Sequence, residues 1–166
     1  MYHAAQSHKG IVSSIAWAPN SCRAVSAGYD KLIMVWEVPK TSKTFNTIST
    51  LKGHMSGVEV VLWSPDGTSI ISGCKEGVIR IWDAVSFVCM KEMRKHDGGI
   101  MCMDISNSNR IISSGRDKVI YVWELGTGKL LSTLSTDDGI TRAICWAPNG
   151  KGFVSAVDEM PRAWDS

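Results

Sequence analysis

The chain contains 166 residues, of which 44% are apolar and 20% are charged. This composition is typical of a globular protein and excludes a disordered or fibrous chain. The net charge of +2 argues against a dedicated nucleic-acid-binding protein, because such proteins carry a strongly basic surface.

Neither the N-terminus nor the apolar runs indicate secretion or insertion into a membrane. The first ten residues contain no apolar segment of the kind that a signal peptide needs. The longest uninterrupted apolar runs, such as 32–36, contain five residues, whereas a membrane-spanning helix needs about 20. The five cysteines are widely spaced and form no Cys-x-x-Cys pair, which is typical of reduced thiols. We therefore expect an intracellular protein, cytoplasmic or nuclear, with no metal site and no cofactor.

Three sets of residues reveal an internal repeat. Each set recurs at intervals of 41 to 46 residues, and the sets keep nearly fixed offsets from one another. Such offsets over four copies indicate a chain built from repeated structural units. The sets are Trp36, Trp82, Trp123 and Trp164; Trp17, Trp63, Ile105 and Trp146; and His8, His54, His96 and Asp137.

Short apolar runs alternate with turns inside each repeat. In the second repeat we predict strands at 58–63, 69–72 and 78–82, separated by the turn sequences Pro-Asp-Gly and Glu-Gly. Runs this short and rich in Val and Ile favour strands over helices. Each repeat is therefore predicted to form four antiparallel strands, without a helix. The strands between the repeats are predicted at 45–51, 87–93 and 129–134.

A Gly-His pair is followed by Trp-Asp, with Trp-Ser-Pro-Asp-Gly between them, and this pattern resembles the WD40 repeat. The resemblance implies an all-β fold, a WD40 β-propeller unit with four four-stranded antiparallel blades per chain. It covers nearly the whole chain, as approximate repeats at 1–37, 44–83, 86–124 and 129–166.

A His, a Ser, an acid and a Trp also recur at fixed places in the repeats. Such a set resembles a catalytic triad, but a nucleophilic site would occur once, whereas this set is repeated. The resemblance implies instead a structural tetrad that ties an outer loop of each blade to its third strand, and no enzyme is predicted. The tetrads are His8, Ser26, Asp30 and Trp36; His54, Ser72, Glu76 and Trp82; His96, Ser113, Asp117 and Trp123; and, in the incomplete fourth set, Asp158 and Trp164.

The copies differ in ways that predict unequal stability. Glu76 stands where the family usually has Asp, and its extra methylene is expected to loosen the second tetrad. The fourth repeat has Asp137 in place of His and carries Pro161 in its third strand. Because proline removes a ladder hydrogen bond, we expect the fourth blade to be the least stable.

The chain ends raise the question of how a ring would close. WD40 propellers close when an N-terminal strand completes the last blade, and we expect residues 2–6 to take that role. Three arrangements remain open: two chains forming an eight-bladed ring, part of a larger propeller, or a closed four-bladed monomer.

The resemblance implies a scaffold that binds protein or peptide partners on the face bearing the loops between the second and third strands. Tyr and Arg are frequent hot-spot residues at such faces, and the basic members suit an acidic or phosphorylated peptide. The candidate residues are Tyr29, Lys75, Arg116, Ile11, Glu59 and Arg142.

The alternative function is association with nucleic acid. The basic residues Lys91, Arg94 and Lys95, with Lys40 and Lys43, form short clusters. No aromatic residues are interleaved among them, so stacking on single-stranded bases is not supported.

Overall fold

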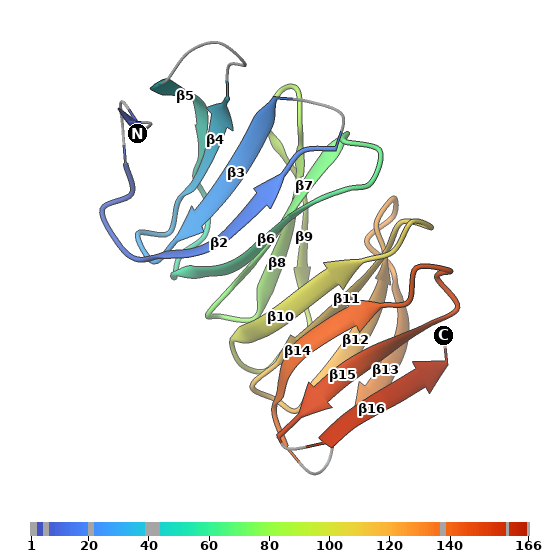
Figure 1. Cartoon of the computed structure of the whole chain (residues 1–166). Coiled ribbons are helices and arrows are strands. Elements are labelled where there is room, and N and C mark those ends of the chain that lie inside the picture. Colours follow the sequence, from blue (N-terminus) through green and yellow to red (C-terminus); the bar gives the residue numbers. More distant parts are fainter. Residues whose placement is uncertain are drawn as a thin grey trace.

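The computed structural model describes residues 3–4, 7–19, 22–38, 44–136, 139–158 and 160–165. These residues form four sheets, and the sequential strands of each sheet pair in antiparallel order (Figure 1). The all-β fold class and the blade architecture are therefore confirmed.

The first blade contains β2 (Val12–Trp17), β3 (Arg23–Gly28), β4 (Ile33–Glu37) and β5 (Thr44–Leu51). The second blade contains β6 (Val58–Trp63), β7 (Ser69–Cys74), β8 (Val78–Asp83) and β9 (Cys89–Arg94). The third contains β10 (Ile100–Ile105), β11 (Arg110–Gly115), β12 (Val119–Glu124) and β13 (Leu130–Ser135), and the fourth β14 (Thr141–Trp146), β15 (Gly152–Val157) and β16 (Met160–Asp165).

The turn between the second and third strands requires a positive φ angle in each blade. Lys31, Gly77 and Lys118 follow the tetrad acid in the first three blades, with φ values of 71°, 74° and 60°. In the fourth blade the loop is shorter, and Asp158 itself has a φ of 48°. Pro161 lies in β16, opposite Ala156 of β15. Among the described residues β16 is an edge strand, and an edge strand tolerates proline.

The described part of the predicted N-terminal strand lies beside the first blade. β1 (His3–Ala4) pairs in parallel with Thr44 and Phe45 of β5, at the outer edge of the first blade. Within this one chain, residues 3–4 therefore do not complete the last blade, which has three described strands. A strand without a hydrogen-bonded neighbour is costly, and here β5 supplies the available edge. Of the predicted segment 2–6, residues 2, 5 and 6 lie outside the described residues.

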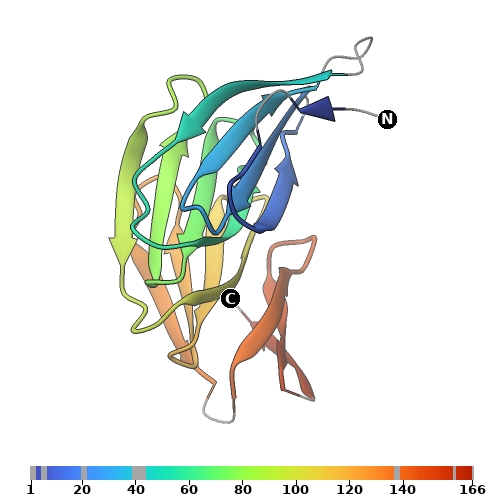
Figure 2. The same cartoon turned by 90° about the vertical axis from the view of Figure 1, so that its left-hand side faces the viewer.

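The four blades stand side by side in an open arc. The innermost strands β2, β6, β10 and β14 neighbour one another in chain order, and Figure 2 shows the first and fourth blades at opposite ends of the arc. The described residues thus do not form a closed four-bladed ring.

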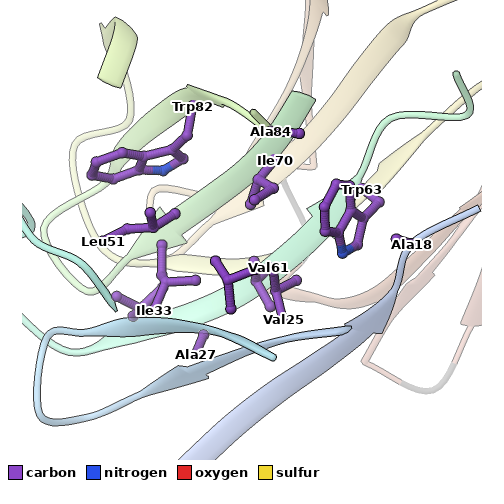
Figure 3. Packing of buried hydrophobic residues seen from close by; sticks show 12 residues of the cluster. Ala18, Val25, Ala27, Ile33, Leu51, Val61, Trp63, Ile70, Trp82 and Ala84 are labelled. Carbon is purple, nitrogen blue, oxygen red and sulfur yellow. The ribbon is translucent and has the colours of Figure 1, made fainter. Parts of the chain in front are cut away.

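Apolar side chains join each blade to the next. At the first junction, Val25 and Ile33 of the first blade pack against Val61, Trp63 and Ile70 of the second (Figure 3). Comparable clusters fill the second and third junctions. Each inner blade therefore has two buried faces, one toward the preceding blade and one toward the following blade.

Candidate functional site

The predicted partner-binding residues lie at the end of the blades where the second and third strands are joined. We call this end the loop face and define it by Ile11, Tyr29, Glu59, Lys75, Arg116 and Arg142. The same backbone hydrogen bond fixes the turn in each of the first three blades. The N–H groups of Tyr29, Lys75 and Arg116 donate to the carbonyls of Ile11, Gly57 and Gly99, respectively, at 2.9–3.0 Å.

The structure brings three of these residues together across the first junction. The Tyr29 hydroxyl donates to a Glu59 carboxylate oxygen at 3.1 Å. The Lys75 ammonium lies 3.4 Å from the centre of the Tyr29 ring and 3.7 Å from the Glu59 carboxylate. The cluster therefore holds an aromatic ring and a neutralised ion pair in one arrangement, and it is partly accessible to solvent.

The other three loop-face residues lie outside this cluster. Ile11 belongs to the first blade, and its side chain is exposed. Arg116 and Arg142 belong to the third and fourth blades and are also exposed, and neither forms an ion pair among the described residues. The loop face thus divides into a self-paired half and an unpaired basic half. Sequence reasoning identified the residues of both halves, but not their pairing.

The first and third tetrads are closed networks of hydrogen bonds. In the third, His96 contacts Asp117 through Nδ1 at 2.9 Å and Ser113 through Nε2 at 2.8 Å, and the Trp123 indole donates to Ser113 at 2.9 Å. The first tetrad repeats this geometry within about 0.1 Å. The backbone N–H of the residue after each His, Lys9 or Asp97, donates to the same carboxylate.

One carboxylate and one imidazole of these networks, Asp30 and His96, have pKa values below their ordinary ranges. Burial opposes ionisation of Asp30, but hydrogen bonds from His8, Lys9 and Leu32 outweigh it and hold the pKa of this carboxyl below its usual value. Burial lowers the pKa of His96, although the contact with Asp117 partly offsets this effect.

The second tetrad lacks its acid contact. His54 Nε2 bonds Ser72 at 2.7 Å, and the Trp82 indole donates to Ser72 at 2.8 Å. The buried Nδ1 of His54 has no hydrogen-bond partner in the described part of the chain, and Glu76 is exposed. Burial, and then the charge of Arg80, lower the pKa of His54 to about 4.

The Ser–His–Asp geometry of the first and third repeats invites comparison with a catalytic triad. In both repeats, however, the serine oxygen already accepts the indole N–H of the tetrad Trp. Ser113 is fully buried, so no substrate reaches it. In the fourth repeat the Trp164 indole donates to Ser155 at 2.8 Å, although no histidine occupies the corresponding place. These hydrogen bonds link residues that lie 9 to 22 positions apart in the sequence.

An apolar groove of about 350 Å³ lies on the outward face of the first blade. Val12, Ile15, Trp17, Ala24 and Trp36 are among its lining residues. They occupy the repeat positions that, in the second blade, pack against the preceding blade. Trp17 is 58% exposed, whereas its equivalent Trp63 is 7% exposed. The groove is one half of a blade-to-blade junction.

The fourth blade presents the complementary half of such a junction. Val154 is 53% exposed, whereas its equivalents Ile71 and Ile112, which face a following blade, are fully buried. The two ends of the arc therefore expose opposite faces of the same type of junction.

The basic residues considered for nucleic acid are partly neutralised. The Arg94 Nε donates to Glu92 at 2.5 Å, and Arg80 pairs with the same carboxylate. Lys91 is half-buried, and Lys95 is exposed. Lys40 and Lys43 lie outside the described residues.

Other chemistry was sought in the part of the chain that the structure describes. No group of three or more metal-ligating side chains occurs there, and all five cysteines are free. No helix among these residues has the length and apolar character needed to cross a membrane.

Comparisons with known proteins point to one family. The family described as "WD domain, G-beta repeat" matches residues 2–37, 45–83 and 87–124. The chain is 26% identical over 178 residues to nuclear distribution protein PAC1 of Arthroderma otae, covering 98% of this chain and 37% of that protein. It is 31% identical over 134 residues to autophagy-related protein 16 of Arabidopsis thaliana, covering 80% of this chain and 25% of that protein. The chain thus spans about a third or less of these relatives.

Proposed function

The chain belongs to the WD40 repeat family, and on this premise we propose that it is a non-catalytic scaffold that binds protein or peptide partners on its loop face. The observation that carries the proposal is the cluster of Tyr29, Glu59 and Lys75. A tyrosine ring held by a hydrogen bond and a cation loses little side-chain freedom on binding, which is a property of hot-spot residues.

The character of the tetrads supports a role without catalysis. The serine oxygens that would act as nucleophiles accept indole hydrogen bonds in both the first and the third repeat. Scaffold function also agrees with the family, and the relatives are named for nuclear distribution and autophagy. The free cysteines fit an intracellular location, in cytoplasm or nucleus.

The loop-face proposal can be tested with site-specific photo-crosslinkers. One is placed at Tyr29, and a matched control is placed at Val85, an exposed residue in the turn after β8, at the opposite end of the blade. We expect proteins to be captured at position 29 and not at position 85. The affinity of a captured partner should then fall by about tenfold or more for Tyr29→Ala and remain unchanged for Val85→Ala.

Equal capture at both positions, or an affinity unchanged by Tyr29→Ala, would contradict the proposal. Binding of an oligonucleotide that weakens steeply with salt, and is lost on replacing Lys91 and Lys95, would favour the nucleic-acid alternative instead.

We further propose that a second copy of the chain covers both exposed ends of the arc. The first blade has no preceding blade to pack against, and the fourth has no following one. The exposed apolar face at each end is therefore the type of face that the other end would pack against. Such a head-to-tail contact, formed twice, closes a ring of eight blades. The alternative occupant is a set of further blades in a longer polypeptide.

Charged substitutions at each end test the closure. Trp17→Glu and Val154→Glu place a charge in an apolar junction and should dissociate the assembly, because a buried unpaired charge is costly. Val85→Glu, at an equally exposed apolar position, is the control. Dissociation by Val85→Glu, or none by the two end variants, would contradict closure by a second copy.

A further inference from the structure

The segment before a tetrad histidine normally forms the outer strand of the preceding blade. β5 ends three residues before His54, and β9 ends two residues before His96. Each of these strands pairs in antiparallel order with the third strand of its blade. The described residues include no blade before His8, and the strand that precedes this histidine, β1, pairs with β5 in parallel instead.

The sequence of β5 makes its outer edge open to such a strand. Its eight residues, TFNTISTL, include neither a charge nor a proline. Charged residues and prolines are the features by which edge strands resist further pairing. β16, the outer strand of the fourth blade among the described residues, contains Pro161, Arg162 and Asp165. The edge of β5 is therefore less protected than the edge of β16.

The two ends of the N-terminal segment are held with different strength. His8 contacts Asp30 at 2.9 Å and Ser26 at 2.8 Å, so its place is fixed by the first tetrad. β1, in contrast, pairs with two residues of β5, Thr44 and Phe45. Short terminal pairings are among the first parts of a fold to open. Residues 3–4 can therefore leave β5 while His8 keeps its position.

The same segment borders the groove that we propose a second copy covers. Phe45, the partner of Ala4 in the β1–β5 register, lines this groove, as do Ser7 and His8. A fourth blade of a second copy, packed over the groove as the preceding blade packs in the internal junctions, would bring its own β16 to this segment. Residues 3–4 then have two edges within reach.

We propose that residues 3–4 alternate between these two edges, and that their pairing with β5 opposes closure of the ring. While β1 lies on β5, the fourth blade of the second copy lacks its fourth strand. When β1 leaves β5, it completes that blade as an antiparallel strand, as β5 and β9 complete the first two blades. The inference rests on the proposed ring closure and names the step that precedes it.

A disulfide that holds β1 on β5 tests this step. The variant carries His3→Cys and Thr44→Cys, at positions that are direct partners in the β1–β5 register. Neighbouring strands lie about 4.8 Å apart, which a disulfide can bridge. The disulfide is formed during refolding from urea at low protein concentration, and peptide mapping distinguishes it from links to the five native cysteines. His3→Cys alone is the matched control.

Light scattering on a size-exclusion column gives the mass, and urea unfolding verifies that each variant is folded. We expect the oxidised double variant to have the mass of one chain, 18.1 kDa, and to double its mass after reduction with dithiothreitol. The His3→Cys control should have the doubled mass in both conditions.

Three results would overturn the inference, and they differ from one another. If the oxidised double variant is folded and has the doubled mass, residues 3–4 do not need to leave β5, and ring closure stands without this step. If the parent chain itself has a mass of 18.1 kDa, ring closure fails and the inference fails with it. If no disulfide forms between the two positions, β1 does not pair with β5 in solution.

Discussion

The second tetrad differs from the first and third in the contacts of its acid. All three share the His–Ser and Trp–Ser hydrogen bonds. Asp30 and Asp117 also reach the imidazole, whereas Glu76 is exposed and the buried His54 Nδ1 has no partner among the residues that the structure describes. The comparison teaches that the hydrogen bonds to the serine survive without the acid, whereas the histidine loses the partner of its second ring nitrogen.

The contact common to all three tetrads is expected to carry the largest effect. Trp82→Ala and Trp123→Ala should each lower the free energy of unfolding by about 3–5 kcal/mol, because each empties a buried aromatic site. The two losses should be similar, since both indoles bind their serine alike. Urea unfolding measures them. An unfolding midpoint unchanged by Trp82→Ala would contradict the fold assignment.

The second tetrad should make stability sensitive to acid. His54 has a pKa of about 4 in the folded chain and about 6.5 when unfolded. Between these values the unfolded chain binds the additional proton, so stability falls as the pH is lowered from 6.5 to 4, by up to about 3 kcal/mol. Urea midpoints at pH 7, 6 and 5 test the slope. If the His54→Gln variant lost as much stability at low pH as the parent chain, the acid sensitivity would come from another residue.

The two acids should respond differently to removal. Asp117→Ala leaves His96 Nδ1 and the Asp97 N–H without an acceptor and should cost about 1–3 kcal/mol. Glu76→Ala removes an exposed carboxylate that forms no hydrogen bond among the described residues, and should change stability by less than about 0.5 kcal/mol. Equal losses in urea unfolding would show that Glu76 supports the fold in a way the geometry does not reveal.

Restoring the missing contact should give the smallest effect. Glu76→Asp shortens the side chain to that of Asp30 and Asp117, and a new hydrogen bond to His54 should stabilise the chain by about 1 kcal/mol. It should also flatten the acid dependence, because a carboxylate partner raises the pKa of the histidine. Asp117→Glu is the reciprocal control and should destabilise. If both Glu76→Asp and Asp117→Glu raised the free energy of unfolding, this explanation of the difference between the tetrads would be wrong.

The repeat period and the turn sequences predicted the β-sheet architecture. The resemblance to the WD40 repeat led us to expect a looser second tetrad at Glu76, and His54 Nδ1 has no partner among the described residues. Both follow from local signals: fixed offsets, turn sequences and the length of one side chain. The strand predicted at 87–93 begins instead at Cys89, because Phe87 has a φ of 61° and closes a turn with Asp83.

Contacts between blades could not be predicted from such local sequence signals. The pairing of Lys75 with Glu59 and Tyr29 depends on side chains from two blades and on their rotamers, which no periodicity encodes. The position of His3 and Ala4 beside β5 depends on which sheet edge is free in space. Both features needed three-dimensional coordinates.

The four blades form an arc whose two end faces are exposed, and we propose that a second copy of the chain covers both. Light scattering on a size-exclusion column tests it most directly. The account predicts a mass of twice 18.1 kDa that does not change on dilution. A soluble species of 18.1 kDa that unfolds cooperatively would contradict it.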